Sequence, residues 1–570
     1  MENNEEKKIE EIKEDSPERT PSESVKGKTK TQSIGKGFVI LSAATVAVKL
    51  MSLIFVPVMS ALLGGDEGYA AFGATNEVFA FIYVIATAGI PVAVSKLVTE
   101  LTAVEDPVAR ERAFKVAKRV TAIVGAFFTA LMIALARPLS LWIGYEETWA
   151  GLMCIAPTIF ICAILSVYRG YFQGRKNMTP TALSQVAEQI VHVCFSIAAV
   201  AILKKLGFGL VEAVAGASLG TAAGAFVALI IVYIFYRRSG RAIRDEIVAA
   251  KDRILEPVTT KSIVRKIFYY GIPITLSSGI QYGGNMIDVA ILKNRLVYGG
   301  IEEGIAKGMY GSLIKARQLI NVPTALVTAL CVSILPAIAG AFALKDTKKA
   351  AENANYGFKL CFMAAVPIAG AFTVFSKQIY EILRFNTNNL ILTAMAMSIL
   401  ITGVVHLQSS VLNSVNKLFN ATLHLAIGIA LKAVLNYFLV AIPALNIYGA
   451  IISTYVSFLV PLILNAILIR RTLGRDFRFV REAKAPIVCT LAMLAGAFAI
   501  YFGISRLLGL IMGTSFSYIQ ALISFVPAAL FGLWFYVFLM GAMGGLTRED
   551  VSSVSPKLVK FMPKTVRSKK

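Results

Sequence analysis

Stretches of about twenty apolar residues recur along this chain, and they limit its fold more than any other feature. One helical crossing of a bilayer needs roughly 20 consecutive apolar residues, and we count fourteen such stretches in 570 residues. Apolar residues make up 56% of the chain and charged residues 16%, against roughly 45–50% and about 25% in soluble domains. A soluble enzyme would have too little polar surface to cover this much apolar material. The sequence therefore predicts an all-α, polytopic membrane protein.

The order of the spans predicts two lobes. The longest internal connection, 237–266, follows the sixth span, and the seventh span starts from the same side as the first. We therefore expect six-helix lobes at 36–236 and 267–469 around a central cavity, followed by two extra helices within 485–543. The fourteen predicted spans are 37–63, 74–98, 116–136, 149–171, 181–203, 211–236, 267–290, 310–341, 358–376, 390–413, 420–442, 448–469, 485–505 and 517–543.

The basic residues between the spans predict the orientation. Loops on the side of the termini hold 28 Lys and Arg residues, and the opposite loops hold 9. Cytoplasmic loops are the ones enriched in Lys and Arg, so both termini should be cytoplasmic in the plasma membrane. This distribution also explains the net charge of +23 without a nucleic-acid partner.

The two ends of the chain differ from the apolar body. Residues 1–35 are highly charged and nearly free of large apolar residues, which predicts a disordered cytoplasmic tail. This segment has no hydrophobic core or cleavage site of a signal peptide. Residues 544–570 form a basic cytoplasmic tail, which we expect to lie against anionic membrane lipids.

Several ionisable residues fall inside the predicted spans. Charged groups at membrane depth are costly and usually face a cavity or a partner, although those near a span's end can extend to the interface instead. Lys49 lies too deep in its span for that escape, whereas Glu77 and Lys96 lie closer to the ends of theirs. The residues that we single out are Lys49, Glu77, Lys96, Glu188, Asp288, Lys315, Arg317 and Lys432.

Polar residues also recur at helical spacing, which places each set on one helix face. One interpretation is a hydrogen-bonded seam between packed helices. Because there are several stripes on helices of both lobes, we instead predict a hydrated central cavity. The stripes are Gln185, Glu188, Gln189 and His192; Ser277, Gln281, Asn285 and Asp288; Arg317, Asn321, Thr324 and Thr328; and Lys432 with Asn436.

Signatures of catalysis are missing from the sequence. It contains no HExxH motif, no GxxxxGK[ST] loop and no GxSxG elbow, so metalloprotease, P-loop and hydrolase chemistry have no support. The six cysteines form no CxxC pair, which leaves no zinc signature. We therefore predict transport without a metal or cofactor, coupled to Na⁺, H⁺ or the membrane potential, and not an enzyme.

Five segments together resemble a known superfamily. They are GGDEGYAAFG at 64–73, ATAGIPVAVSKLVTE at 86–100, YRGYFQGRKNMTPTALSQVAEQIVHV at 168–193, SILPAIA at 333–339 and KAVLNYFLVAIPALNIYGAIIST at 432–454. The chain resembles the polysaccharide transporters of the MOP superfamily, which also contains the MATE exporters. Within them it is similar to the SpoVB/YtgP branch and to the MurJ lipid II flippases, over about residues 36–545.

The resemblance implies a flippase for a lipid-linked cell-wall precursor, with undecaprenyl-diphosphate-linked lipid II as the favoured substrate and cell-wall synthesis enzymes as candidate partners. It also implies that the last two helices form a groove for the lipid tail. Lys49 and Lys96 match basic positions of the family, and either Lys315 or Arg317 matches a third. Together with Lys432, Asn285 and Asn436, these residues are the predicted binding set, and Glu77, Glu188 and Asp288 are the predicted coupling groups or counter-ions. The remaining predicted polar residues are Gln185, Gln189, His192 and Gln281.

Three other functions remain open from the sequence. The first is export of a different lipid-linked glycan, such as a teichoic or capsular unit. The second is a cation-coupled drug exporter of the MATE type, in which Glu188 and Asp288 would bind the ion. Its cationic substrates favour an acidic pocket, whereas the predicted cavity has more basic than acidic groups. The third is a scaffold that recruits wall-synthesis enzymes without transporting anything.

Overall fold

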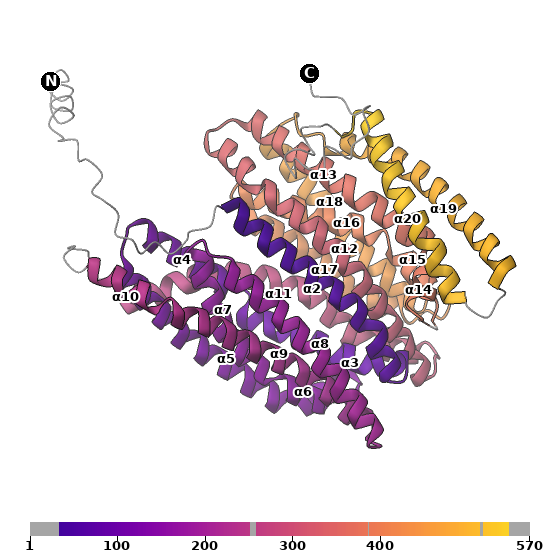
Figure 1. The fold of residues 1–570 in the computed structure, drawn as a ribbon, viewed down its shortest axis with the longest axis horizontal. Helices are drawn as coiled ribbons and strands as arrows, with labels where there is room; N and C mark the ends of the chain where they lie inside the picture. Colours follow the sequence, from indigo (N-terminus) through magenta and orange to yellow (C-terminus); the bar gives the residue numbers. More distant parts are fainter. Residues whose placement is uncertain (1–33, 251–257, 386, 513–516, 547–570) are drawn as a thin grey trace.

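The computed structural model describes residues 34–250, 258–385, 387–512 and 517–546. All regular elements within these ranges are helices, as the apolar runs predict. Figure 1 shows them as one bundle, with α2 running between the helices of the first half of the chain and those of the second half. Of the predicted tails, 1–33 and 547–570 lie outside the described residues.

The helices of the first predicted lobe follow the chain from α2 to α9, and α10 is the short helix after them. Their bounds are α2 (Ile34–Leu62), α3 (Asp66–Thr87), α4 (Ile90–Ala103), α5 (Pro107–Ile143), η1 (Glu146–Thr148), α6 (Trp149–Ile155), α7 (Pro157–Gly174), α8 (Thr179–Lys205), α9 (Leu210–Arg238) and α10 (Gly240–Ala249).

The second half of the chain begins with two very long helices and ends with a separate pair. The bounds are α11 (Thr260–Tyr298), α12 (Glu303–Ala343), α13 (Thr347–Val374), α14 (Ser376–Ile382), α15 (Leu390–Met395), α16 (Ser398–Ser414), α17 (Leu418–Leu439), α18 (Ile447–Leu473), η2 (Phe479–Ala483), α19 (Lys484–Met512) and α20 (Ser517–Ala542). Helices α19 and α20 pack against each other and reach the rest through α13 and α14.

Each of the fourteen predicted spans falls on one helix or on two helices in direct succession. Two of the breaks fall at glycine or proline: α3 and α4 part at Gly89, just before Pro91, and α6 gives way to α7 at Pro157. Twelve helical segments of the described chain are long and apolar enough to cross a membrane. Helices α11 and α12 are not among the twelve, so the count of fourteen stays a prediction.

The segment predicted as the inter-lobe loop, 237–266, is more structured than a loop. It contains α10, whose Ile243 is buried. Glu246 of α10 pairs with Arg110 of α5 and, at 2.5 Å, with Arg175 after α7. These two ion pairs hold α10 against the first lobe; residues 251–257 lie outside the described part.

Helix α11 connects the two halves of the bundle. It packs against α3, α4 and α5 of the first lobe and also against α17 of the second. Glycines permit one of these contacts, because a Cβ on Gly89 would lie 2.2 Å from the carbonyl oxygen of Gly271. Helix α12 makes a second connection by packing against α2 and α3. The boundary between the lobes is therefore formed by α2, α3, α11 and α12.

Candidate functional site

A cavity of about 550 Å³ lies at the boundary between the lobes. Its walls come from α2 of the first lobe and from α11, α12 and α15–α18 of the second. Three cationic residues, Lys49, Arg317 and Lys432, contribute to the lining. The other polar lining residues are Thr45, Gln281, Tyr282, Asn285, Asn321, Thr324, Thr328, Ser398, Thr402, His406, Thr454 and Ser457.

The polar stripe predicted on α12 faces this cavity along its whole length. Arg317, Asn321, Thr324 and Thr328 all line it. The hydroxyls of Thr324 and Thr328 donate to backbone carbonyls one turn earlier, at 2.8 Å each. Their hydrogen-bonding capacity is thus largely satisfied by the helix itself, and Arg317 and Asn321 supply the stripe's remaining polar groups.

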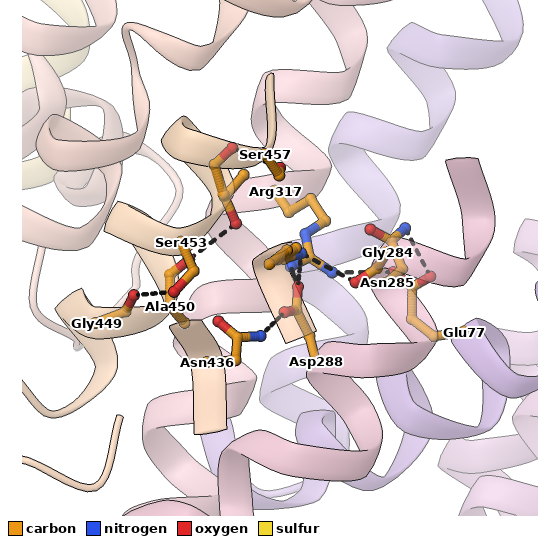
Figure 2. Close-up of polar contacts among 12 residues, drawn as sticks. Glu77, Gly284, Asn285, Asp288, Arg317, Asn436, Gly449, Ala450, Ser453 and Ser457 are labelled. Atoms are coloured by element: carbon orange, nitrogen blue, oxygen red, sulfur yellow. Dashed lines mark hydrogen bonds and ion pairs between the residues drawn. The ribbon is translucent and has the colours of Figure 1, made fainter. Parts of the chain in front are cut away.

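Beneath the cavity, Asp288 of α11 is the centre of an ionic cluster (Figure 2). Its side chain is 0% exposed. One carboxylate oxygen accepts hydrogen bonds from Lys432, at 2.7 Å, and from Arg317; the other accepts from Asn436 at 2.7 Å. Lys432 also donates to the carbonyl oxygen of Gly284 at 2.9 Å. The cluster therefore joins α11, α12 and α17 through charge-assisted bonds.

The same cluster reaches the first lobe through Glu77 of α3. One oxygen of Glu77 lies 3.6 Å from Arg317, and the other accepts from Asn285 at 3.0 Å. Two carboxylates, Glu77 and Asp288, thus face two cations, Arg317 and Lys432, so the buried charges balance. Balanced and hydrogen-bonded charges are the form in which an interior tolerates ions.

Lys49 differs from the two other cations of the cavity. It is half-buried on α2 and lines the cavity. Among the described residues it has no carboxylate within ion-pair distance, whereas Arg317 and Lys432 are both paired. Lys49 is therefore the cation whose charge is available to a ligand without breaking an existing pair.

Two residues of the predicted binding set lie elsewhere. Lys96 is exposed on α4, where its ammonium sits 3.9 Å above the ring of Tyr270. Lys315 is buried and bonds to Asp66 and, at 3.4 Å, to Ser60. Residues 315 and 317 differ by about 200° around a helix, so only one of them can face the cavity. Arg317 is the one that does.

The stripe predicted on α8 forms contacts between helices and does not line the cavity. Glu188 pairs with Arg169 of α7 at 2.7 Å, and Gln189 donates to Ser52 of α2 at 3.3 Å. The His192 ring lies 5.0 Å from the ring of Phe55. Within the described chain, one buried atom of Gln185 and one of His192 lack a hydrogen-bond partner.

The α11 stripe divides between the cavity and the cluster. Gln281 and Asn285 line the cavity, and Asp288 lies behind it. The Gln281 amide nitrogen is 3.5 Å from Nε2 of His406 on α16. Sequence reasoning missed His406 and the hydroxyls of α16 and α18, because isolated polar residues in an apolar helix form no stripe.

The lobes are bridged on one side of the bundle. We call the side on which α2 begins the N side and the opposite side the far side. On the far side Asp66 bonds to Ser312 and Lys315 of α12. A Cβ on Gly311 would lie 2.0 Å from the carbonyl oxygen of Asp66, so the backbones touch there. The far side is therefore closed by direct contact between α3 and α12.

A second group of far-side contacts links the loop after α5 to α11 and α12. Lys293 donates to the carbonyl oxygen of Gly144 and pairs with Glu303 at 2.9 Å. Lys307 pairs with Glu147 at 2.7 Å. Asp66 and these charged residues lie outside the predicted spans, so the search for charges inside the spans missed them.

Comparisons with known proteins agree with this architecture. A family described as "Polysaccharide biosynthesis protein" matches residues 34–342. "Lipid II flippase MurJ" of Bacillus subtilis (strain 168) is 24% identical over 532 residues, which covers 90% of this chain and 96% of that protein. "Stage V sporulation protein B" of the same organism is 24% identical over 489 residues, covering 84% of this chain and 92% of that protein.

Solved structures show the same fold. An inward closed conformation of the lipid II flippase MurJ matches with a TM-score of 0.61 at 14% identity, covering 88% of this chain and 99% of that one. An inward-facing multidrug resistance MATE transporter of the MOP superfamily matches with a TM-score of 0.59 at 16% identity, covering 75% and 98%. The MurJ relative and the two solved neighbours are by name flippases or a transporter and not enzymes. With a family match over more than half of its length, the chain is a multi-pass membrane protein that belongs to the polysaccharide biosynthesis protein family and is homologous to MurJ and SpoVB.

Proposed function

We propose that this protein is a flippase that moves a lipid-linked cell-wall precursor from the cytoplasmic to the outer leaflet by alternating access. The favoured substrate is undecaprenyl-diphosphate-linked lipid II, and the N side is the cytoplasmic side. The proposed mechanism uses no resident metal or organic cofactor. Membrane lipids surround the protein, and wall-synthesis enzymes are its candidate protein partners.

The observation that carries this proposal is the charge of the cavity wall. Among the described lining residues three are cationic and none is a carboxylate. Glu77 and Asp288 behind the wall balance Arg317 and Lys432, so Lys49 gives the site its net positive charge. A diphosphate would gain charge-assisted hydrogen bonds from these side chains. A cationic drug would instead be repelled by like charges in a partly desolvated site. Binding sites often exclude unwanted ligands by such repulsion.

The closed far side supports alternating access. In the proposed cycle the headgroup enters from the N side while the contacts of Asp66 and Lys307 hold the far side shut. Breaking these contacts and closing the N side would expose the same cavity to the other leaflet. The membrane potential is worth about 2.3 kcal/mol per charge per 100 mV, and it is our favoured energy source, with Na⁺ or H⁺ coupling as the alternatives.

The lipid tail needs a separate apolar site, which we place at the last two helices. A cleft of about 340 Å³ lies between α13, α19 and α20, and its lining includes Phe372, Phe525 and Leu533. On this proposal the headgroup stays in the polar cavity while the hydrocarbon chain remains in lipid along this cleft. The pair α19–α20 would then act as a tail guide outside the two lobes.

Binding of the substrate tests the proposal directly. Native mass spectrometry of the purified protein measures retention of a lipid II analogue by the parent chain, Lys49→Gln and Lys96→Gln. The two variants remove the same charge, but only Lys49 lines the cavity, so we expect retention to fall in Lys49→Gln alone. Equal retention in both variants, or tight binding of an ethidium-like cationic dye to the parent, would favour a drug exporter.

The identity of the glycan needs a second experiment. After conditional depletion of the protein, the precursor that accumulates in the cytoplasmic leaflet identifies the cargo. Accumulated lipid II supports the favoured substrate, and an accumulated teichoic or capsular precursor assigns the function to that glycan instead. If no lipid-linked precursor accumulates while assembly of the wall enzymes is disturbed, the protein is a scaffold.

A further inference from the structure

A second cleft opens on the first lobe, away from the central cavity. Its volume is about 440 Å³, and it lies between α5, α7 and α9. Two cations and two tyrosines line it together with four aliphatic residues. The lining residues are Lys118, Arg119, Ala122, Ile164, Tyr168, Leu229, Ile230 and Tyr233.

The polar and apolar parts of this cleft are separated along the membrane normal. Helix α5 runs from the N side inward, so Ala122 lies one turn, about 6 Å, deeper than Lys118. Helices α7 and α9 run the other way, so Ile164 lies one turn deeper than Tyr168, and Leu229 one turn deeper than Tyr233. All three helices therefore place polar groups at the N-side rim and aliphatic groups beneath it.

The two cations at the rim have no acidic partner among the described residues. Nearby, Arg110 and Arg175 share Glu246, and the Glu111 carboxylate accepts from Tyr171 and Tyr236. The carboxylates of Glu246 and Glu111 are thus already engaged, whereas Lys118 and Arg119 have no carboxylate within ion-pair distance among the described residues.

An aromatic cluster forms the back of the cleft. The Tyr168 ring packs edge-on against Phe114 at 5.1 Å and against Tyr236 at 5.5 Å. Tyr168 is buried by this packing, and Tyr233 is 45% exposed at the opening. Tyrosines are enriched at the interface between headgroups and hydrocarbon, and Tyr168 and Tyr233 lie in the N-side parts of α7 and α9.

We propose that this cleft binds an anionic phospholipid of the N-side leaflet. The lipid phosphate would lie between Lys118 and Arg119, and one acyl chain would follow the aliphatic wall toward Leu229 and Ala122. Basic pockets between membrane helices recognise anionic headgroups in this way. The site is separate from the cavity of the proposed function, so either can fail without the other.

Lipid retention on the purified full chain tests the site. The protein is titrated with dioleoyl phosphatidylglycerol or dioleoyl phosphatidylcholine, and bound lipid is counted by native mass spectrometry. Each basic residue near an anionic headgroup is worth about a fivefold change in affinity. The double variant Lys118→Gln/Arg119→Gln should therefore lose its preference for phosphatidylglycerol by roughly tenfold or more.

Two matched variants separate this site from general charge effects. Lys204→Gln/Lys205→Gln removes two exposed cations from the far-side end of α8 and should leave the preference unchanged. Lys118→Arg/Arg119→Lys keeps both charges and should retain it. Ala122→Phe fills the apolar part, so it should reduce binding of phosphatidylglycerol without changing the charge.

Three results would overturn the proposal. An unchanged preference in the Lys118/Arg119 double variant would mean that the two side chains simply extend into water. An equal loss in the Lys204/Lys205 variant would assign the preference to net charge. Displacement of the lipid by millimolar inorganic phosphate, with Ala122→Phe having no effect, would make the cleft an anion site and not a lipid site.

Discussion

Replacing Asp288 with asparagine tests whether the cluster beneath the cavity is a balanced ionic unit. The fully buried carboxylate accepts hydrogen bonds from Arg317, Lys432 and Asn436. Asp288→Asn keeps the shape of the side chain but removes its charge. Two cations would then face Glu77 alone, and one net positive charge would be left in the protein interior.

The structure sets the expected size of the effect. Removing one partner of a buried ion pair costs about 3–5 kcal/mol. Arg317 keeps Glu77 at 3.6 Å, and Lys432 keeps the carbonyl oxygen of Gly284 at 2.9 Å. These remaining contacts place the expected loss at the lower end, about 3 kcal/mol. Asp288→Asn/Lys432→Met restores the charge balance, so it should be less destabilised than Asp288→Asn alone.

Unfolding by SDS in mixed micelles measures these differences. Glu188→Gln is the matched control, because Glu188 also pairs with an arginine at 2.7 Å but its side chain is 29% exposed. A partly exposed pair contributes about 1 kcal/mol or less. If Asp288→Asn is as stable as the parent, the cluster is not a charge-balanced unit. The same conclusion follows if the double variant loses as much free energy of unfolding as Asp288→Asn and Lys432→Met lose together as single variants.

Three further predictions concern orientation, the cavity and the far-side closure. A reporter fused after Lys570 should be cytoplasmic, and a cysteine replacing Glu67, an exposed residue in the first turn of α3, should label from outside; external labelling within α10 would contradict this topology. Lys49→Ala should abolish translocation at normal protein abundance, with Lys49→Arg more active than Lys49→Gln, and full activity of the alanine variant would remove Lys49 from the binding set. Asp66→Asn removes the charge that holds Lys315, so a cysteine replacing Thr324 should label faster from the far side; an unchanged labelling rate would show that the contact of Asp66 does not close the cavity.

The fold was largely predictable because its main constraint, the length of each apolar run, can be read directly from the sequence. Run length decides whether a helix can cross a bilayer, and each predicted span falls on helical structure. Helix α11, the least apolar of the predicted spans, carries the central cluster residue Asp288. Its departure from an ordinary apolar helix therefore indicated part of the site.

The site was predictable only in part. The spacing of polar residues shows which of them share a helix face, but it does not show what that face packs against. The stripes on α8 and α12 have comparable spacing, yet the first contacts α2 and α7 while the second lines the cavity. Which of Lys315 and Arg317 faces inward depends on helix rotation, which packing decides. The partners of Asp288 come from helices far apart in the chain, so no local pattern reveals them.

If the protein is a flippase as proposed, the cluster also explains how binding of the diphosphate is linked to movement of the lobes. Arg317 and Lys432 are held by Asp288, so an incoming diphosphate must compete with that carboxylate, while the unpaired Lys49 can contact the ligand first. Each bond that the ligand takes from Arg317 weakens its contact with Glu77, which belongs to α3 of the other lobe. A ligand shifts a conformational equilibrium only by its different affinity for the two states. Competition for Arg317 provides this difference in affinity. When the cavity is empty, Arg317 is free to contact Glu77 and the connection between the lobes is strongest; when a ligand binds Arg317, that connection is weaker.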